Sequence, residues 1–352
     1  MHPDRLLRDP DTFQGRVEVH PFQSQVLKNN PLGDPSLRET PVYLPPQASS
    51  QTLPVVYMLV GFTGRPHSLL ETHPWKSGVI LALDRAMSAG EMPPAIVVMP
   101  NGFTRYGGSQ YVNSSAVGAY EDHIVQELVP WVDATFPACA GRRGLIGKSS
   151  GGFGALHLGM RHSDLFGAVA SIAGDCHFEY GYAQDFLPAL RGLTPFGGDP
   201  ARFLAEFEAS HDLSGDGHAT LNLLAMSACY SPNPDAPLGF DLPVDPHTGA
   251  RVQKVWERWL RFDPVRACEE YAQGLRSLDL LHLEAGTTDE FHLQFGLRVL
   301  AQRLESLKIE HYHEEFDGGH FGINERYVQL IPRLVDALSS ASNRPGQTPL
   351  AR

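Results

Sequence analysis

Cysteine and long apolar runs are both scarce in this chain. The 352 residues include four cysteines and no C-x-x-C pair, which argues against a disulfide framework, a zinc cluster and a redox motif. No run approaches the ~20 apolar residues that a membrane helix needs. The polar opening MHPDRLLRDPDTFQG lacks the apolar stretch of a secretory signal. We therefore expect a cytoplasmic protein with free thiols at Cys139, Cys176, Cys229 and Cys268.

Basic charge is scarce as well. Lys and Arg total 28 against 40 Asp and Glu, which gives a net charge of −12. Such a chain repels nucleic acid and anionic lipid, so we expect neither a nucleic acid nor a membrane as a partner. The hydrophobic fraction of 42% suffices for a substantial core. A small molecule is the expected partner, and the sequence leaves a homodimer open.

What the chain does have is an alternation of strand and helix patterns. Residues 15–27 and 38–46 alternate like two strands around a turn-rich linker. Continuous apolar runs, typical of buried parallel strands, occur at 54–61, 95–100, 144–147, 168–174 and 280–286. Helical periodicity lies between these runs, from 150, at 293–304, at 327–338, and at 125–136, where Pro130 interrupts it. The pattern predicts an α/β fold with a mostly parallel central sheet and helices on both faces.

Residues 175–277 break this alternation. They contain no buried-strand run and are too long for a structureless loop. We expect a helical cap, inserted into a single domain that spans 13–340, with flexible tails at 1–12 and 341–352. The cap is rich in aromatic residues, which favours a substrate with aromatic or apolar groups. These residues are Phe178, Tyr180, Tyr182, Phe186, Trp256, Trp259 and Phe262.

Residues 142–152, RRGLIGKSSGG, fit two motifs that exclude each other. A phosphate-binding loop, G-x-x-x-x-G-K-[ST], needs its first glycine at position 142, where Arg142 stands. A nucleophile elbow, G-x-S-x-G, needs a strand before it and a helix after it, and both are predicted here. We therefore expect a catalytic serine. It is Ser149, since glycines stand two positions before and after it, whereas Lys148 stands two positions before Ser150.

A serine nucleophile needs a histidine base that a carboxylate orients, in the chain order Ser, Asp/Glu, His. Asp289 lies in the turn TTDEF after an apolar strand run, and Glu290 beside it is the alternative acid. His320 lies in DGGHFG, directly after the strand pattern KIEHYHEEF. Asp317 is so near His320 in sequence that we expect it to shape the turn. These residues predict the triad Ser149, Asp289 and His320.

The tetrahedral intermediate of ester cleavage also needs two backbone N–H donors. One belongs to the residue after the nucleophile, which is Ser150. The other comes from the loop after the third strand, where we choose Phe62 in VGFTG. This chemistry requires no cofactor and no metal. His311 and His313 share a strand face without a third ligand, so we expect a plain strand surface there.

Five segments resemble the "Putative esterase" family of α/β hydrolases: GFTG, MPNGFTRYGGSQYVNS, YEDHIVQELVPWVDATFP, GKSSGGFGALHL and DGGHFGI. That family includes esterase D (S-formylglutathione hydrolase), feruloyl esterases, enterochelin esterases and mycolyl transferases. The segment NNPLGDPSLRETPVYLPP resembles the enterochelin-esterase-like branch in particular. The resemblance covers residues 15–174 and 280–340. It implies an α/β-hydrolase fold, Ser149 as nucleophile, His320 as base and a carboxylate in GTTDEF.

The resemblance also implies that Phe62 and Ser150 are the oxyanion donors. We expect the GFTG and GGSQYVNS segments to contact the substrate, although the second fits a surface loop held by Asn and Ser equally well. The expected substrate contacts are Gly61, Thr63, Gln110, Tyr111 and Asn113.

Together these residues predict a serine esterase that works through an acyl-enzyme. Ser149 attacks the ester carbonyl, His320 moves the proton, Asp289 holds the imidazole, and water releases the acid. Three alternatives stay open: acyl transfer to an alcohol acceptor, hydrolysis of an enterochelin-like siderophore trilactone, and ligand binding without catalysis.

Overall fold

The computed structural model of the chain describes residues 13–71 and 78–340. The tails predicted at 1–12 and 341–352 lie outside the described residues. The strands of the main sheet are β1 (Arg16–Gln23), β2 (Leu37–Leu44), β3 (Leu53–Leu59), β4 (Ile96–Val98), β7 (Ala138–Lys148), β8 (Ala168–Ile172), β9 (Leu280–Gly286) and β10 (Tyr312–Phe316). A separate ribbon pairs β5 (Asn113–Ser114) with β6 (Gly118–Ala119).

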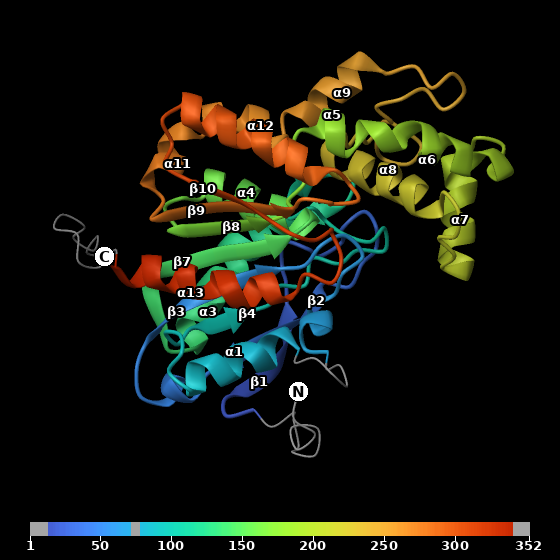
Figure 1. The fold of residues 1–352 in the computed structure, drawn as a ribbon. Helices are drawn as coiled ribbons and strands as arrows, with labels where there is room; N and C mark the ends of the chain where they lie inside the picture. The colour runs from blue at the N-terminus through green and yellow to red at the C-terminus, as the bar shows by residue number, and fades with distance from the viewer. Residues whose placement is uncertain (1–12, 72–77, 341–352) are drawn as a thin grey trace, which may run out of the picture.

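The main sheet has the strand order β1-β2-β4-β3-β7-β8-β9-β10. The pairs β1–β2 and β2–β4 are antiparallel, and every later pair is parallel. The prediction of a mostly parallel sheet is confirmed, and the two strands predicted at the N-terminus form its antiparallel edge. Because parallel strands end at the same edge, the loops after β3, β7, β8, β9 and β10 meet at one edge of the sheet (Figure 1).

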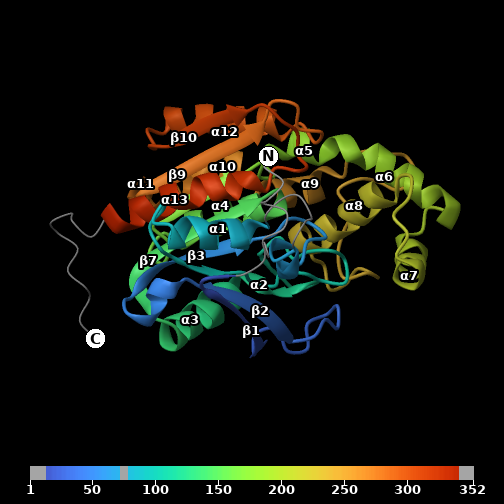
Figure 2. The ribbon, with the colours of Figure 1, turned by 60° about the horizontal axis from the view of Figure 1, so that its bottom comes forward.

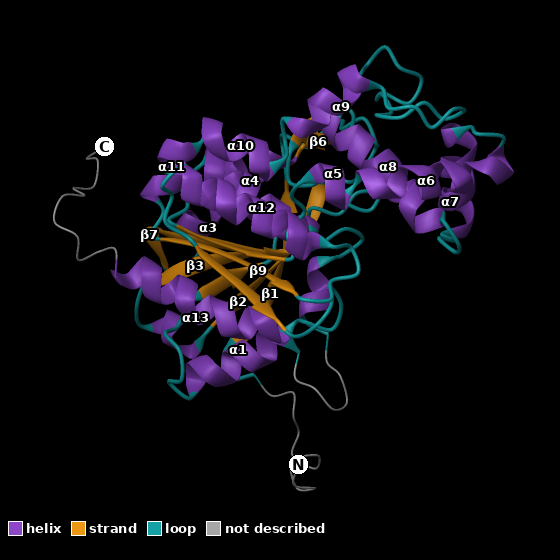
Figure 3. Ribbon diagram, turned by 45° about the horizontal axis from the view of Figure 1, so that its top comes forward, coloured by secondary structure: helices purple, strands orange, loops and turns teal. Residues whose placement is uncertain are grey.

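Helices cover both faces of the sheet (Figure 3). One face carries α1 (Val79–Ser88) and α13 (Glu325–Ser340), and the other carries α3 (Val129–Thr135), α4 (Ser150–Arg161) and α12 (Leu293–Ser306). Along β3, Tyr57 packs into the core under α4 and α12, whereas Val56 and Met58 pack into the core under α1 and α13. A strand buried on both faces has no polar side, which explains its continuous apolar run.

The helical pattern at 125–136 forms two pieces. A short helix α2 (Tyr120–Asp122) leads into a π-helical segment at His123–Leu128, and α3 begins after it with Pro130 in its first turn. Proline has no N–H to donate, so it is tolerated where a helix starts and not where one continues. Short 3-10 turns occur at Pro46–Ser49, Pro66–Leu69, Ala183–Asp185 and Thr194–Phe196.

The chain between β8 and β9 is helical. Its helices are α5 (Phe178–Gly181), α6 (Phe186–Leu193), α7 (Pro200–Ser210), α8 (Gly217–Tyr230), α9 (Gln253–Leu260), α10 (Pro264–Glu270) and α11 (Ala272–Ser277). Figure 1 and Figure 2 both show α6, α7 and α8 reaching beyond the end of the sheet. In contrast, α10 and α11 pack against α4, within the layer that covers the sheet.

The aromatic residues of this insertion mostly fill its own core. Phe178, Phe186, Trp256 and Trp259 are buried together with the apolar face of α8, and Tyr180 is exposed. Packing thus accounts for most of these rings, whereas Tyr182 lines the cavity beside Ser149, so the expectation of an aromatic or apolar substrate stays a prediction. No described helix combines the length and the apolar character that a membrane span requires.

Candidate active site

Ser149 lies in the turn between β7 and α4, with φ 58° and ψ −128°. A non-glycine residue in this conformation is strained and persists only where its surroundings hold it. A Cβ atom on Gly147 would lie 2.1 Å from the carbonyl oxygen of Gly151, and one on Gly151 would lie 2.1 Å from that of Leu59. Only glycine fits at either position, so both glycines are needed for the turn to pass beside β3.

His320 and Asp289 form a buried pair in which Nδ1 and Oδ2 lie 2.8 Å apart. Asp289 follows β9 and His320 follows β10, and these neighbouring parallel strands bring the two side chains together. Glu290 makes a different contact, because its Oε2 accepts a 2.5 Å hydrogen bond from the backbone N–H of His320. The two adjacent acids therefore hold different parts of one residue, Asp289 the ring and Glu290 the main chain.

Lys148 supplies a second contact to the main chain of His320. Its Nζ donates a 3.1 Å hydrogen bond to the His320 carbonyl oxygen. Burial lowers the pKa of the Lys148 ammonium, and the charges of Asp289 and Glu290 oppose that shift. The sequence analysis used Lys148 only to choose between two serines, and nothing in the motif indicated this contact.

Phe62 and Ser150 line the same cavity as Ser149. Ser150 opens α4, so its N–H is one of the donors that a helix start leaves without a partner inside the helix. Phe62 stands in the loop after β3, which a 2.8 Å hydrogen bond from Thr63 N–H to the Gly107 carbonyl holds in place. A helix start and a fixed loop that both border a serine can supply two N–H donors to a developing oxyanion.

A cavity of about 120 Å³ is lined by both Ser149 and His320. The structure thus brings these two side chains to one site, although no hydrogen bond joins Ser149 Oγ to His320 Nε2. In enzymes without bound substrate, the distance between nucleophile and base often exceeds that of a hydrogen bond. The insertion between β8 and β9 contributes a wall of the cavity through Tyr182, Asp185, His218 and Asn222.

Three of the expected substrate contacts, Gly61, Thr63 and Asn113, differ in how they stand to this cavity. Thr63 lines it. Gly61 borders Ser149 so closely that a Cβ atom there would lie 3.2 Å from the Ser149 Cβ. Asn113 is exposed and exchanges hydrogen bonds with Asp122, so it ties down a surface ribbon and does not line the cavity.

The other two, Gln110 and Tyr111, are buried behind the site. Tyr111 donates a 2.8 Å hydrogen bond to the Val60 carbonyl, and Gln110 Nε2 donates one of 3.0 Å to the Tyr182 hydroxyl. The φ angle is positive in both residues, 53° in Gln110 and 56° in Tyr111, as it is in Ser149. Strained backbone of this kind concentrates at functional sites, where the surrounding structure enforces it.

Asp175 is a cavity residue that the sequence analysis missed. It is buried, and its Oδ2 accepts hydrogen bonds from Ser150 Oγ at 2.9 Å and from Tyr182 Oη at 2.8 Å. A usable signal was present, since Asp175 follows the apolar run 168–174 directly and so lies at the same edge of the sheet as the elbow.

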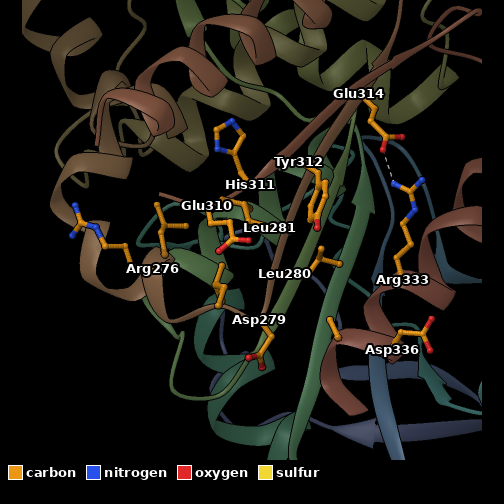
Figure 4. A pocket seen from close by; sticks show the side chains of 13 residues that line it. Arg276, Asp279, Leu280, Leu281, Glu310, His311, Tyr312, Glu314, Arg333 and Asp336 are labelled. Carbon is orange, nitrogen blue, oxygen red and sulfur yellow. Dashed lines mark hydrogen bonds and ion pairs between the residues drawn. The ribbon is translucent and has the colours of Figure 1, made fainter. Parts of the chain in front are cut away.

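A larger cavity of about 520 Å³ lies at the opposite end of β9, lined by its first residues Leu280 and Leu281 (Figure 4). Its side chains carry charges of both signs, and Arg333 pairs there with Glu314 at 2.7 Å. It is distant in the fold from the loops after β9 and β10. Cavity size alone therefore does not mark the reactive centre of this protein.

Among the described residues, one group has metal-ligand character: His282, Glu284 and Glu314, whose ligand atoms lie within 4.8 Å of one another. His311 and His313 are not part of it. Arg326 pairs with Glu284 at 2.6 and 2.8 Å, and Arg333 pairs with Glu314. Two arginines thus balance the two carboxylates, and the group is explained as an ion-pair network between the sheet and α13.

Comparison with known proteins places this chain in a family. The family described as "Putative esterase" matches residues 36–334. The chain belongs to this esterase family. It is accordingly a carboxylic ester hydrolase, and the resemblance drawn from its motifs is confirmed.

Solved structures show the same fold. A ferulic acid esterase is 21% identical, with a TM-score of 0.59 and coverage of 93% of this chain and 100% of that one. The S-formylglutathione hydrolase of Agrobacterium tumefaciens is 18% identical, with a TM-score of 0.55 and coverage of 95% and 97%. Fluorophosphonate-binding serine hydrolase F of Staphylococcus aureus is 15% identical, with a TM-score of 0.56 and coverage of 92% and 98%. The predicted α/β-hydrolase fold of this esterase is confirmed.

Proposed function

We propose that this esterase cleaves carboxylic esters with Ser149 as nucleophile, His320 as general base and Asp289 as the acid that orients the imidazole. The observation that carries the proposal is that Ser149 and His320 line one cavity. Asp289 does not line this cavity, and its Oδ2 lies 2.8 Å from Nδ1 of His320. A proton on Nδ1 donates to Asp289, which leaves Nε2 free to accept the serine proton.

In the first half of the reaction, Ser149 Oγ forms a bond to the ester carbonyl carbon while its proton moves to His320 Nε2. The oxyanion that results accepts hydrogen bonds from the backbone N–H groups of Phe62 and Ser150. Each such donor lowers the barrier by ~3 kcal/mol. When the tetrahedral intermediate collapses, the carbonyl–alkoxy bond breaks and His320 returns the proton to the leaving alcohol.

In the second half, water replaces the alcohol. It attacks the acyl carbon as His320 takes its proton, and the Ser149 ester bond breaks with return of that proton to Oγ. The carboxylic acid leaves and the enzyme is restored. The whole cycle uses side chains and backbone groups of this chain alone.

We further propose that residues 13–340 act as one hydrolase domain and that 175–277 serves as its cap. The support is that Tyr182, Asp185, His218 and Asn222 of this segment form a wall of the cavity opposite the sheet loops. Contacts from the insertion thus shape the space that the substrate enters.

Labelling with a fluorophosphonate probe tests the nucleophile. We expect Ser149→Ala to lose both labelling and turnover of p-nitrophenyl esters, and Ser150→Ala to keep labelling, because its backbone N–H remains. Peptide mapping of the labelled protein should place the adduct on Ser149. Labelling at Ser150, or undiminished turnover in Ser149→Ala, refutes the assignment.

The substrate panel should include S-formylglutathione and esters of ferulic acid, because the names of two structural neighbours mention these compounds. Rates across this panel and across acyl lengths would define the natural substrate class.

A further inference from the structure

Asp175 stands out among the residues of the catalytic cavity. It is 7% exposed, and it is one of the residues that line the cavity. Its Oδ2 accepts hydrogen bonds from Ser150 Oγ and Tyr182 Oη. The proposed mechanism uses the backbone N–H of Ser150 and assigns no role to Asp175.

The carboxylate of Asp175 has hydrogen-bonding capacity to spare. An ionised carboxylate offers about four acceptor positions, and Ser150 and Tyr182 both bond to one oxygen. Burial raises the pKa of Asp175, and the hydrogen bonds from Tyr182 and Ser150 oppose the rise. The charge of His320 and the side chain of Gln110 oppose it as well, and a further donor in the cavity would stabilise the buried carboxylate in the same way.

A second acceptor near Ser150 also lacks a partner. Gln110 is 1% exposed, and its Oε1 receives no hydrogen bond from any described residue. Its Nε2 donates to the same Tyr182 hydroxyl that bonds to Asp175. Buried acceptors without donors are rare in folded proteins, and this one lies behind the cavity, in contact through Tyr182 with the carboxylate that lines it.

The charge of the cavity points in the same direction. Asp175 and Asp185 both line it, and no lysine or arginine is among its described lining residues. An anionic substrate group would meet two carboxylates and no lysine or arginine, so it is disfavoured. A neutral group that donates hydrogen bonds is favoured.

We propose that Asp175 is a specificity residue that accepts a hydrogen bond from a hydroxyl group of the substrate. The esterase then prefers hydroxylated esters to unsubstituted esters of the same size, and it rejects esters with a free carboxylate. The inference rests on the proposed function, because the contact between Asp175 and Ser150 places the hydroxyl near the carbonyl that Ser149 attacks.

The first experiment needs the wild-type protein alone. Values of kcat/KM are measured for methyl 3-hydroxybutyrate, methyl butyrate and monomethyl succinate, and, for the alcohol side, for 2-hydroxyethyl butyrate and propyl butyrate. We expect at least a roughly tenfold preference for the hydroxylated ester in one of the two sets, as for a hydrogen bond to a charged group. The set that shows it identifies the part of the substrate that reaches Asp175.

The second experiment compares Asp175→Asn with Asp235→Asn, which changes an exposed acid of the same insertion. In Asp175→Asn we expect the hydroxyl preference to fall about five- to tenfold and hydrolysis of monomethyl succinate to rise relative to methyl butyrate. The control should keep both ratios. Because a ratio of two substrates is independent of the amount of active enzyme, partial unfolding of the variant does not imitate this result.

Equal rates on hydroxylated and unsubstituted esters in the wild type overturn the proposal without any variant. An unchanged ratio in Asp175→Asn overturns it as well. Failure of the proposed function would look different, since no ester in the panel would then be hydrolysed at a rate that depends on Ser149.

Discussion

Lys148 Nζ lies 3.1 Å from the backbone carbonyl oxygen of His320 and donates a hydrogen bond to it. Glu290 accepts a hydrogen bond from the N–H of the same residue, so both backbone polar groups of His320 are held. The two contacts come from different elements, one from the last residue of β7 and one from the loop after β9. The residue that precedes Ser149 is thereby linked to the loop that carries the imidazole.

This link predicts a kinetic effect of Lys148→Met. Without the hydrogen bond the imidazole loop shifts, and we expect kcat to fall about ten- to a hundredfold with little change in KM, because the walls of the cavity stay in place. Steady-state kinetics with p-nitrophenyl butyrate measure both constants. Lys254→Met, on the exposed side of α9, is the control. Full kcat in Lys148→Met would show that the contact is incidental.

The neighbouring acids predict a contrast between two variants. Asp289→Asn should reduce kcat on the order of 10³–10⁴-fold, because an amide favours the wrong tautomer of His320 and cannot stabilise the imidazolium. Glu290→Gln keeps an oxygen that can accept from the His320 N–H, so we expect a loss of less than about tenfold. Equal losses in the two variants would contradict the division of roles between ring and main chain.

The glycines of the elbow predict a steric effect. Gly147→Ala places a methyl group 2.1 Å from a carbonyl oxygen, which the fold cannot accommodate without moving β7 or α4. We expect a large drop in the free energy of unfolding, or no folded protein. In the control Gly217→Ala, at the start of α8, the new Cβ meets only ordinary contacts beyond 3.6 Å, so stability should be kept. Urea unfolding followed by circular dichroism measures both; a folded, active Gly147→Ala would refute the packing described here.

A buried carboxylate predicts how stability depends on pH. Glu121 on α2 bonds to His157 at 3.0 Å and to His162 at 2.7 Å, which ties α2 to α4. Although burial alone would raise it, the hydrogen bonds from these histidines hold the pKa of Glu121 well below its ordinary value of 4.5. Burial also lowers the pKa of His157 from 6.5, against the effect of Glu121.

Both shifts have the same consequence. The unfolded chain binds these protons more tightly than the folded protein does, so acid favours unfolding. We expect the free energy of unfolding to fall as the pH drops below about 6.5, and to fall further below about 4.5. In Glu121→Gln we expect a loss of about 3 kcal/mol at pH 7 and a weaker acid dependence below pH 4.5. Urea titrations from pH 4 to 8 test this, with the exposed Glu305→Gln as control; an unchanged acid slope would contradict the assignment.

Some residues of the candidate site could be predicted because the proposed chemistry leaves a local pattern. The elbow needs glycine at both flanks of Ser149, since the turn brings backbone within 2.1 Å of a Cβ position. Asp289 and His320 could be placed because each follows a strand pattern, apolar before Asp289 and mixed before His320, and the ends of parallel strands meet at one edge. The choice between Asp289 and Glu290 was left open, because side chains one residue apart point to different partners only once the loop is folded.

The insertion shows where composition is a poor guide. Its aromatic residues suggested an aromatic or apolar substrate, which stays a prediction: Trp256 and Trp259 are buried in a hydrophobic core, whereas Tyr182 lines the cavity. Composition records how much apolar area a segment must bury, and it does not record which side faces a ligand. Polar residues of the insertion also line the cavity, and two of them, His218 and Asn222, lie four residues apart on α8.

The sequence by itself determined the strand and helix alternation, the sharp turn at Ser149 and the order of the reactive residues, because each depends on neighbours within a few positions. Only the tertiary structure decided that Lys148 holds the carbonyl of His320 and that Asp175 bonds to Ser150. Those contacts join loops from different strands. Which side chains meet there depends on strand order and on the packing of the whole sheet, and no local pattern encodes either.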